Sequence, residues 1–88
     1  METTVTRTLY ETMQRDPATN AAVLEALRLF AADDWGEVPQ EDKEANDRDK
    51  AAGVGRILAR YKTPSGDIYI TQYPGSDSPA SVMYCREY

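Results

Sequence analysis

The chain has 88 residues, of which 41% are hydrophobic and 28% are charged, a composition typical of one folded domain with a small core. With 15 acidic residues, 10 basic residues and no histidine it carries a net charge of −5, which disfavours direct binding to nucleic acids or anionic membranes. The single cysteine, Cys85, excludes an intramolecular disulfide, and no apolar run is long enough to span a membrane, so a cytoplasmic protein without a membrane partner is expected.

The first predicted element lies within residues 4–11 and has two interpretations. Thr8 and Glu11 match a capping box, which predicts a helix of about two turns that starts at Thr8. The alternation of residues from Thr4 to Leu9 also fits a strand. Both interpretations stay open at this point.

A longer helix is predicted to begin after Asp16. That residue suits the N-cap, and Pro17 suits the first helical position, where its missing N–H costs no hydrogen bond. The apolar stripe expected to face the core consists of Val23, Leu24, Leu27, Phe30 and Ala31. The helix is expected to end near Asp33, and Trp35-Gly36 to form the following turn, with the indole closing one end of the core.

A highly charged helix is predicted from Pro39 to about Ala52. Only Ala45 and Ala52 give it a thin apolar side, so we expect it to pack lightly. The glycines of residues 53–55 then end the helix and lead into a strand.

Three strands are predicted in the last part of the chain. They cover residues 56–62, 68–73 and 80–85, and turns at residues 63–67 and 74–79 join them into an antiparallel meander. In the first strand, Ile57, Ala59 and Tyr61 share one face. The other, basic face is formed by Arg56, Leu58, Arg60 and Lys62.

The expected fold class is therefore α+β, in a single domain over residues 1–88. One or two N-terminal helices and a charged helix are expected to pack on a three-stranded antiparallel sheet.

No catalytic residue, metal site or cofactor is predicted, and the chain is not expected to be an enzyme. Cys85 has no visible base to activate its thiol. The oxygen-rich run at residues 42–46 superficially resembles a calcium loop, but Asp47 stands where the turn glycine belongs. The glycines at residues 53–55 follow a helix and precede a strand, the reverse of the order in a dinucleotide-binding fingerprint.

The tyrosines on the predicted sheet allow a nucleic-acid interpretation. Tyr69 and Tyr73, beside Arg56 and Arg60, resemble the base-stacking surface of an RNA-recognition sheet. Tyrosine is also a favoured strand residue, and the net charge of the chain opposes binding to phosphates. Direct nucleic-acid binding is therefore not expected.

Most of the negative charge lies in residues 33–49, called the acidic stretch below. It holds eight acidic and two basic residues, whereas residues 50–88 carry five basic and three acidic residues. The candidate partner-binding residues are Asp33, Asp34, Trp35, Glu37, Glu41, Asp42, Glu44, Asp47 and Asp49.

The acidic stretch has two interpretations. It can imitate nucleic-acid phosphates and occupy a basic groove of another protein. From Glu41 to Asp49 a helix rises about 12 Å, over which duplex DNA carries about seven charges, so five acids with two bases give only partial mimicry. Alternatively, it is a solvated helix stabilised by the ordinary pairs Lys43–Asp47 and Glu44–Arg48.

A pattern of residues in the second half of the chain resembles a known family. It consists of Asp34-Trp35-Gly36, Glu41-Asp42, Asn46, Arg56-Ile57, Tyr61, Ile68-Tyr-Ile-Thr71 and Glu87-Tyr88. The pattern spans residues 27–88 and is similar to that of small proteins carried by plasmids, phages and other bacterial mobile elements, a family without an established biochemical activity. Residues 73–78 depart from it, because an Asp-Arg followed by threonines is expected there, so any function seated in that loop does not carry over.

The resemblance implies a setting in a bacterial host. Small acidic proteins of mobile elements often disarm host defence, as anti-CRISPR and antirestriction proteins do, by binding a nuclease complex where nucleic acid would bind. The leading hypothesis is a non-enzymatic, anti-CRISPR-like inhibitor whose acidic stretch engages Lys and Arg residues of a host nuclease or CRISPR effector. Trp35 would anchor that contact or hold the turn that presents the acids.

The alternative hypothesis is a self-associating accessory protein of a mobile element with no inhibitory role. It would form a homodimer through an edge or a face of the tyrosine-rich sheet.

Overall fold

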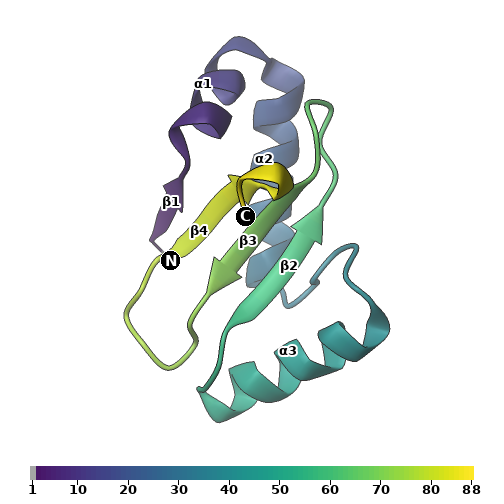
Figure 1. The fold of residues 1–88 in the computed structure, drawn as a ribbon, viewed down its shortest axis with the longest axis vertical. Helices are drawn as coiled ribbons and strands as arrows, with labels where there is room; N and C mark the ends of the chain where they lie inside the picture. The colour runs from purple at the N-terminus through teal and green to yellow at the C-terminus, as the bar shows by residue number, and fades with distance from the viewer. Residues whose placement is uncertain (1) are drawn as a thin grey trace.

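The computed structural model describes residues 2–88, in which a helical layer packs on a four-stranded sheet (Figure 1). In chain order the elements are β1 (Thr3–Val5), α1 (Arg7–Arg15), α2 (Pro17–Ala31), α3 (Gln40–Ala52), β2 (Ile57–Tyr61), β3 (Ile68–Gln72), β4 (Ala80–Tyr84) and the 3₁₀ turn η1 (Cys85–Glu87). The predicted α+β class is confirmed. The predicted three-stranded sheet is incomplete, because β1 adds a parallel fourth strand.

The sheet has the order β1-β4-β3-β2. The predicted meander is confirmed, since β2 pairs antiparallel with β3, and β3 pairs antiparallel with β4. Strand β1 pairs parallel with β4, with Thr4 opposite Ser81. A three-residue strand whose partner is 77 positions away leaves almost no local signal, because its pairing depends on contacts far along the chain.

The N-terminal segment is both strand and helix, in succession. The strand ends at Val5, and α1 begins at Arg7, so the predicted start of the helix at Thr8 is one residue late. Thr6 is the N-cap of α1, but its hydroxyl donates to Glu87 Oε1 at 2.8 Å and makes no capping bond. This contact joins the beginning of the described chain to its end.

Helix α2 begins as predicted. Asp16 accepts hydrogen bonds from the Ala18 N–H at 3.2 Å and from the Thr19 hydroxyl at 2.6 Å. The buried face of α2 consists of Thr19, Val23, Ala26 and Phe30. The predicted stripe is therefore wrong at two positions, because Leu24 is 55% exposed and Ala31 is also exposed. The buried face follows the i, i+4, i+7, i+11 spacing that begins at Thr19.

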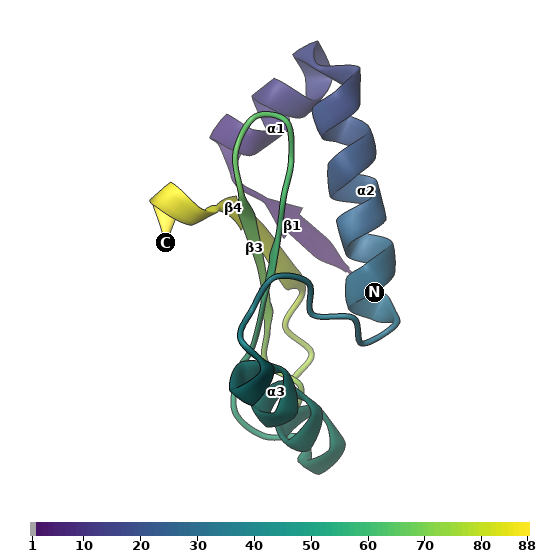
Figure 2. The same cartoon turned by 90° about the vertical axis from the view of Figure 1, so that its right-hand side faces the viewer.

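The core lies between the helices α1 and α2 and one face of the sheet. The edge-on view in Figure 2 shows α2 along that side of the strands and α1 across the end of the sheet near the β2–β3 turn. Leu9, Val23 and Phe30 meet the alternating inward residues of the strands, such as Ile70 and Val82. The opposite face of the sheet faces the viewer in Figure 1, and the short turn η1 at the C-terminus lies over one part of it. This face carries the half-buried side chains of Leu58, Arg60, Tyr69 and Met83.

Helix α3 lies at the opposite end of the molecule from α1 (Figure 2). The prediction that it packs on the sheet through Ala45 and Ala52 is wrong. Its one buried residue is Asn46, while Ala45 is half-buried and Ala52 is exposed. Asn46 bonds the outer edge of β2, so α3 flanks the edge of the sheet. None of the helices within residues 2–88 has the length and apolar character needed to cross a membrane.

Candidate protein-binding surface

Trp35 belongs to the core. Its side chain is 3% exposed and packs edge-on against Phe30, with the ring centroids 5.3 Å apart. The indole Nε1–H donates to Oδ1 of Asp47 at 2.9 Å. These contacts match the interpretation in which Trp35 holds the turn. Asp47 accepts the indole hydrogen bond and therefore helps to hold the same turn.

The segment around Trp35 closes one edge of the sheet. The Arg60 N–H donates to the Trp35 carbonyl at 3.2 Å, and the Glu37 N–H donates to the Arg60 carbonyl at 2.7 Å. Gly36, with φ of 75°, lies between them, and a Cβ at this position would overlap the Arg60 carbonyl oxygen. Only glycine combines this backbone conformation with this close approach.

Asn46 closes the same edge one step further along β2. Its Nδ2 donates to the Leu58 carbonyl at 2.9 Å, and its Oδ1 accepts from the Leu58 N–H at 3.4 Å. The amide thereby imitates the backbone of a neighbouring strand. The outward N–H and C=O groups of Leu58 and Arg60 are thus both paired, so β2 offers no free edge for a second chain.

Two further acids of the acidic stretch have partners in the fold, and a third is partly covered by it. Asp33 forms an ion pair with Lys50. Asp34 accepts the Gly36 N–H on Oδ1 at 3.1 Å. Asp49 is half-buried, with its carboxylate next to Gly55.

The remaining acids form an exposed surface, called the α3 acidic surface below. It consists of Glu37, Glu41, Asp42 and Glu44. The ion pairs within residues 2–88 are Arg7–Glu11, Glu25–Arg28, Asp33–Lys50 and Arg60–Asp67, and none of them includes these four acids. The expected pairs Lys43–Asp47 and Glu44–Arg48 are therefore not formed; Glu44 instead accepts from Gln40 at 3.4 Å.

The helix periodicity explains why Glu41 and Glu44 are exposed, whereas Asp42 lies only about 40° around the helix from Asn46 and is exposed in the first turn of α3. Asn46 faces β2, and Glu41 and Glu44 lie about 140° and 160° around the helix from it, so they point away from the sheet. Glu41 and Asp42 also occupy the first turn of α3, where negative charge is favoured by the helix dipole. The acidic stretch is thus divided between acids that build the fold and acids that face solvent.

The open face of the sheet carries the predicted arginines and tyrosines. Arg60 donates from Nε and Nη2 to Oδ2 of Asp67 at 3.0 and 2.8 Å, so its charge is paired. Tyr69 contacts Tyr88 edge-on at 5.1 Å, and the Arg56 guanidinium lies 5.1 Å from the Tyr88 centroid. The absence of direct nucleic-acid binding stays a prediction.

The thiol of Cys85 is half-buried, and burial raises its pKa, against a smaller opposing effect of Arg60. A raised pKa keeps the thiol protonated and weakens it as a nucleophile. Among residues 2–88, no three acidic or cysteine side chains come together as a metal site would require.

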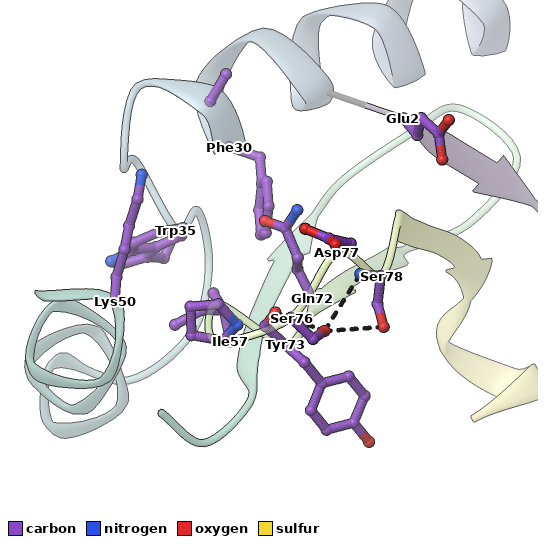
Figure 3. Close-up of a pocket in the computed structure, with 12 residues that line it drawn as sticks. Glu2, Phe30, Trp35, Lys50, Ile57, Gln72, Tyr73, Ser76, Asp77 and Ser78 are labelled. Atoms are coloured by element: carbon purple, nitrogen blue, oxygen red, sulfur yellow. Dashed lines mark hydrogen bonds between the residues drawn. The ribbon is translucent and has the colours of Figure 1, made fainter. Parts of the chain in front are cut away.

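A hollow of about 680 Å³ lies beside Trp35 (Figure 3). Phe30, Trp35 and Ile57 line its inner wall but are nearly fully buried, so they offer little apolar surface to a ligand. Lys50 and Asp77 stand at its rim, with Lys50 already paired to Asp33. Five residues of the loop at 73–78 also line it, Tyr73, Pro74, Ser76, Asp77 and Ser78.

No protein-family model matches the chain, and neither the curated proteins nor the solved structures include a significant match. The resemblance to proteins of mobile elements therefore stays a prediction. The residues that carry it do have identifiable places: Trp35, Gly36 and Asn46 close the β2 edge.

Proposed function

We propose that this protein is a non-enzymatic inhibitor that binds a basic surface of a host nuclease or CRISPR effector through its α3 acidic surface. The observation that carries the proposal is that Glu37, Glu41, Asp42 and Glu44 are exposed and have no ion-pair partner within residues 2–88. Unpaired surface carboxylates of one sign attract Lys and Arg residues and accelerate association with a basic groove.

The small size of the α3 acidic surface limits the size of the proposed contact. Four carboxylates, three of them within the first five residues of α3, match a small number of Lys and Arg side chains. The surface is too short to replace a long duplex. The surface is large enough to block one part of a nucleic-acid-binding groove of the effector, in the cytoplasm of a bacterial host.

The experiment is capture of host proteins on the immobilised chain, followed by assay of the captured nuclease. Wild-type protein is expected to retain and inhibit a nuclease or CRISPR effector, with binding that weakens as salt increases. The triple variant Glu41→Lys, Asp42→Lys, Glu44→Lys is expected to lose both binding and inhibition.

A control for charge reversal elsewhere is Glu11→Lys on α1, at the other end of the molecule, where the exposed Glu11 pairs with Arg7. Circular dichroism must show that both variants remain folded, because reversing the first-turn acids also opposes the α3 dipole. Retention of full inhibition by the folded triple variant would refute the proposal.

A second candidate is the self-associating accessory protein. The observation that favours it is that, within residues 2–88, β1 is an edge strand paired with β4 alone, while the β2 edge is closed by Asn46 and the Trp35 segment. Pairing by strand addition would therefore use β1. Sedimentation that gives a concentration-independent dimer without any inhibition would favour this candidate.

A further inference from the structure

A shallow, open groove of about 420 Å³ lies between α2 and the segment from Asp34 to Glu37, and Tyr61 and Lys62 complete its lining. Helix α2 contributes Ala22, Ala26 and Leu29 to it. Ala26 is almost fully buried, while Ala22 and Leu29 are half-buried, so small apolar side chains leave room along the helix. A groove of this kind suits an unbranched aliphatic chain, because its methylene groups can pack on the apolar surface while its charged end remains solvated.

The charges around this groove are mostly negative. Glu25, Asp34 and Glu37 line it with carboxylates, and Lys62 contributes the one ammonium group among its lining residues. Glu25 is bonded to Arg28, which lowers its pKa and keeps it ionised. Asp34 and Glu37 have no ion pair within residues 2–88. Because Asp34 Oδ1 already accepts the Gly36 N–H, the oxygens open to a visiting cation are Asp34 Oδ2 and those of Glu37.

The wall that carries these two carboxylates is held in place. The Tyr61 hydroxyl donates to the Asp34 carbonyl at 2.7 Å, and the Glu37 N–H donates to the Arg60 carbonyl at 2.7 Å. The Asp34 side chain is further fixed by the Gly36 N–H. A site with a fixed backbone loses little conformational freedom when a ligand enters.

We propose that this groove accepts one arginine side chain of the partner. Its methylene groups would lie along Ala22, Ala26 and Leu29, and its guanidinium would meet Asp34 and Glu37. Arginine fits better than lysine because its planar fork of five N–H groups can bond two carboxylates at once. The inference rests on the proposed function, since Glu37 belongs both to this groove and to the α3 acidic surface.

The test is a titration followed by ¹H–¹⁵N NMR with N-acetylarginine N-methylamide as the probe. The amide signals of Ala22, Ala26 and Gly36 are expected to shift together, with a Kd on the order of 1 mM for so small a ligand. The citrulline analogue has nearly the same shape without the charge, and it is expected to bind about tenfold more weakly. Equal binding of the two probes, or shifts confined to other residues, would overturn the proposal.

Two variants separate the apolar and the charged parts of the groove. Ala22→Leu fills the groove without changing the charge, and Glu37→Gln removes one carboxylate with little change in shape. Each is expected to weaken binding of the arginine probe by about fivefold or more, whereas the control Glu11→Gln, on the exposed side of α1, leaves the Kd of the probe unchanged. If Ala22→Leu does not fold, Glu37→Gln alone decides, and an unchanged Kd in that variant counts against the groove.

The inference and the proposed function can fail separately. An effector that is inhibited through Glu41, Asp42 and Glu44 but is insensitive to Glu37→Gln and Ala22→Leu would refute the arginine site alone. Binding of the arginine probe in the groove, without capture of any nuclease, would refute the inhibitor function alone.

Discussion

The indole N–H of Trp35 donates to the carboxylate of Asp47 across twelve positions of the chain, at 2.9 Å. This bond fixes α3 to the turn that follows α2. The number of acidic residues in this part of the chain therefore overstates the negative charge that a partner can contact, because the Asp47 carboxylate accepts a hydrogen bond from the buried indole N–H. Lys50, whose Nζ lies 5.8 Å from the centre of the indole ring, pairs with Asp33 on the same side of the molecule.

Replacing Asp47 by alanine is expected to lower the free energy of unfolding by about 1 to 2 kcal/mol, because the buried indole N–H loses its acceptor. Asp47→Asn keeps an acceptor oxygen and is expected to lose less. The control Glu44→Ala, on the exposed side of the same helix, should change stability by less than about 0.5 kcal/mol. Urea denaturation measures all three, and equal losses for Asp47→Ala and Glu44→Ala would contradict the assigned role.

Asn46→Ala is expected to lower the free energy of unfolding by about 2 kcal/mol. The backbone N–H and C=O groups of Leu58 both lose their hydrogen-bond partner, at an edge of the sheet that α3 covers. Hydrogen exchange gives a local readout, since the Leu58 amide should exchange faster in the variant while the amides of β3 keep their protection. Arg48→Ala, on the outward side of α3, is the control and should leave the Leu58 amide protected. A Leu58 amide that exchanges equally fast in wild type and variant would show that Asn46 does not close the edge.

Two glycines with similar backbone angles make a matched pair. Gly36 has φ of 75° and Gly53 has φ of 68°, but a Cβ would strike the Arg60 carbonyl at Gly36 and nothing within 4 Å at Gly53. Gly53→Ala is expected to lower the free energy of unfolding by about 1 kcal/mol, because alanine is strained in the left-handed conformation. Gly36→Ala is expected to lower it by about 3 kcal/mol or more, because the overlap with the Arg60 carbonyl adds to that strain. Thermal unfolding of the two variants checks this order, and a Gly53 variant as unstable as the Gly36 variant would contradict the close approach.

The cap of α2 predicts a pH dependence. Hydrogen bonding from Thr19, and less strongly from the Ala18 and Thr19 backbone, lowers the pKa of Asp16 below its ordinary value of 3.8. The ionised carboxylate therefore stabilises the fold above pH 3.8, and this contribution is lost as the pH falls through the folded-state pKa. Asp16→Asn keeps a capping oxygen but does not titrate.

The stability advantage of wild type over Asp16→Asn is accordingly expected to shrink between about pH 6 and about pH 2, as measured by denaturation at each pH. Thr19→Val removes the largest cause of the shift and should reduce this pH dependence. An advantage that stays constant over the whole range would show that Asp16 does not titrate differently in the folded chain.

The local sequence was sufficient for the elements whose signals lie within a few residues. Asp16-Pro17 marks the start of α2, and alternation marks β2, β3 and β4, since capping and side-chain alternation depend on neighbours along the chain. The acidic stretch was also visible as charge. Its division into structural and exposed acids was not.

That division depends on tertiary contacts. Asn46 and Asp47 sit in a helix with no apolar stripe, and their partners, Leu58 and Trp35, each lie twelve positions away. Likewise, β1 exists only because its three residues meet β4 from the other end of the chain. The sequence by itself determined the fold class and where the negative charge lies along the chain, because both follow from composition and short-range pattern. Only the tertiary structure decided which acids are held by the fold and which remain without an ion pair, because those contacts join residues far apart in the chain.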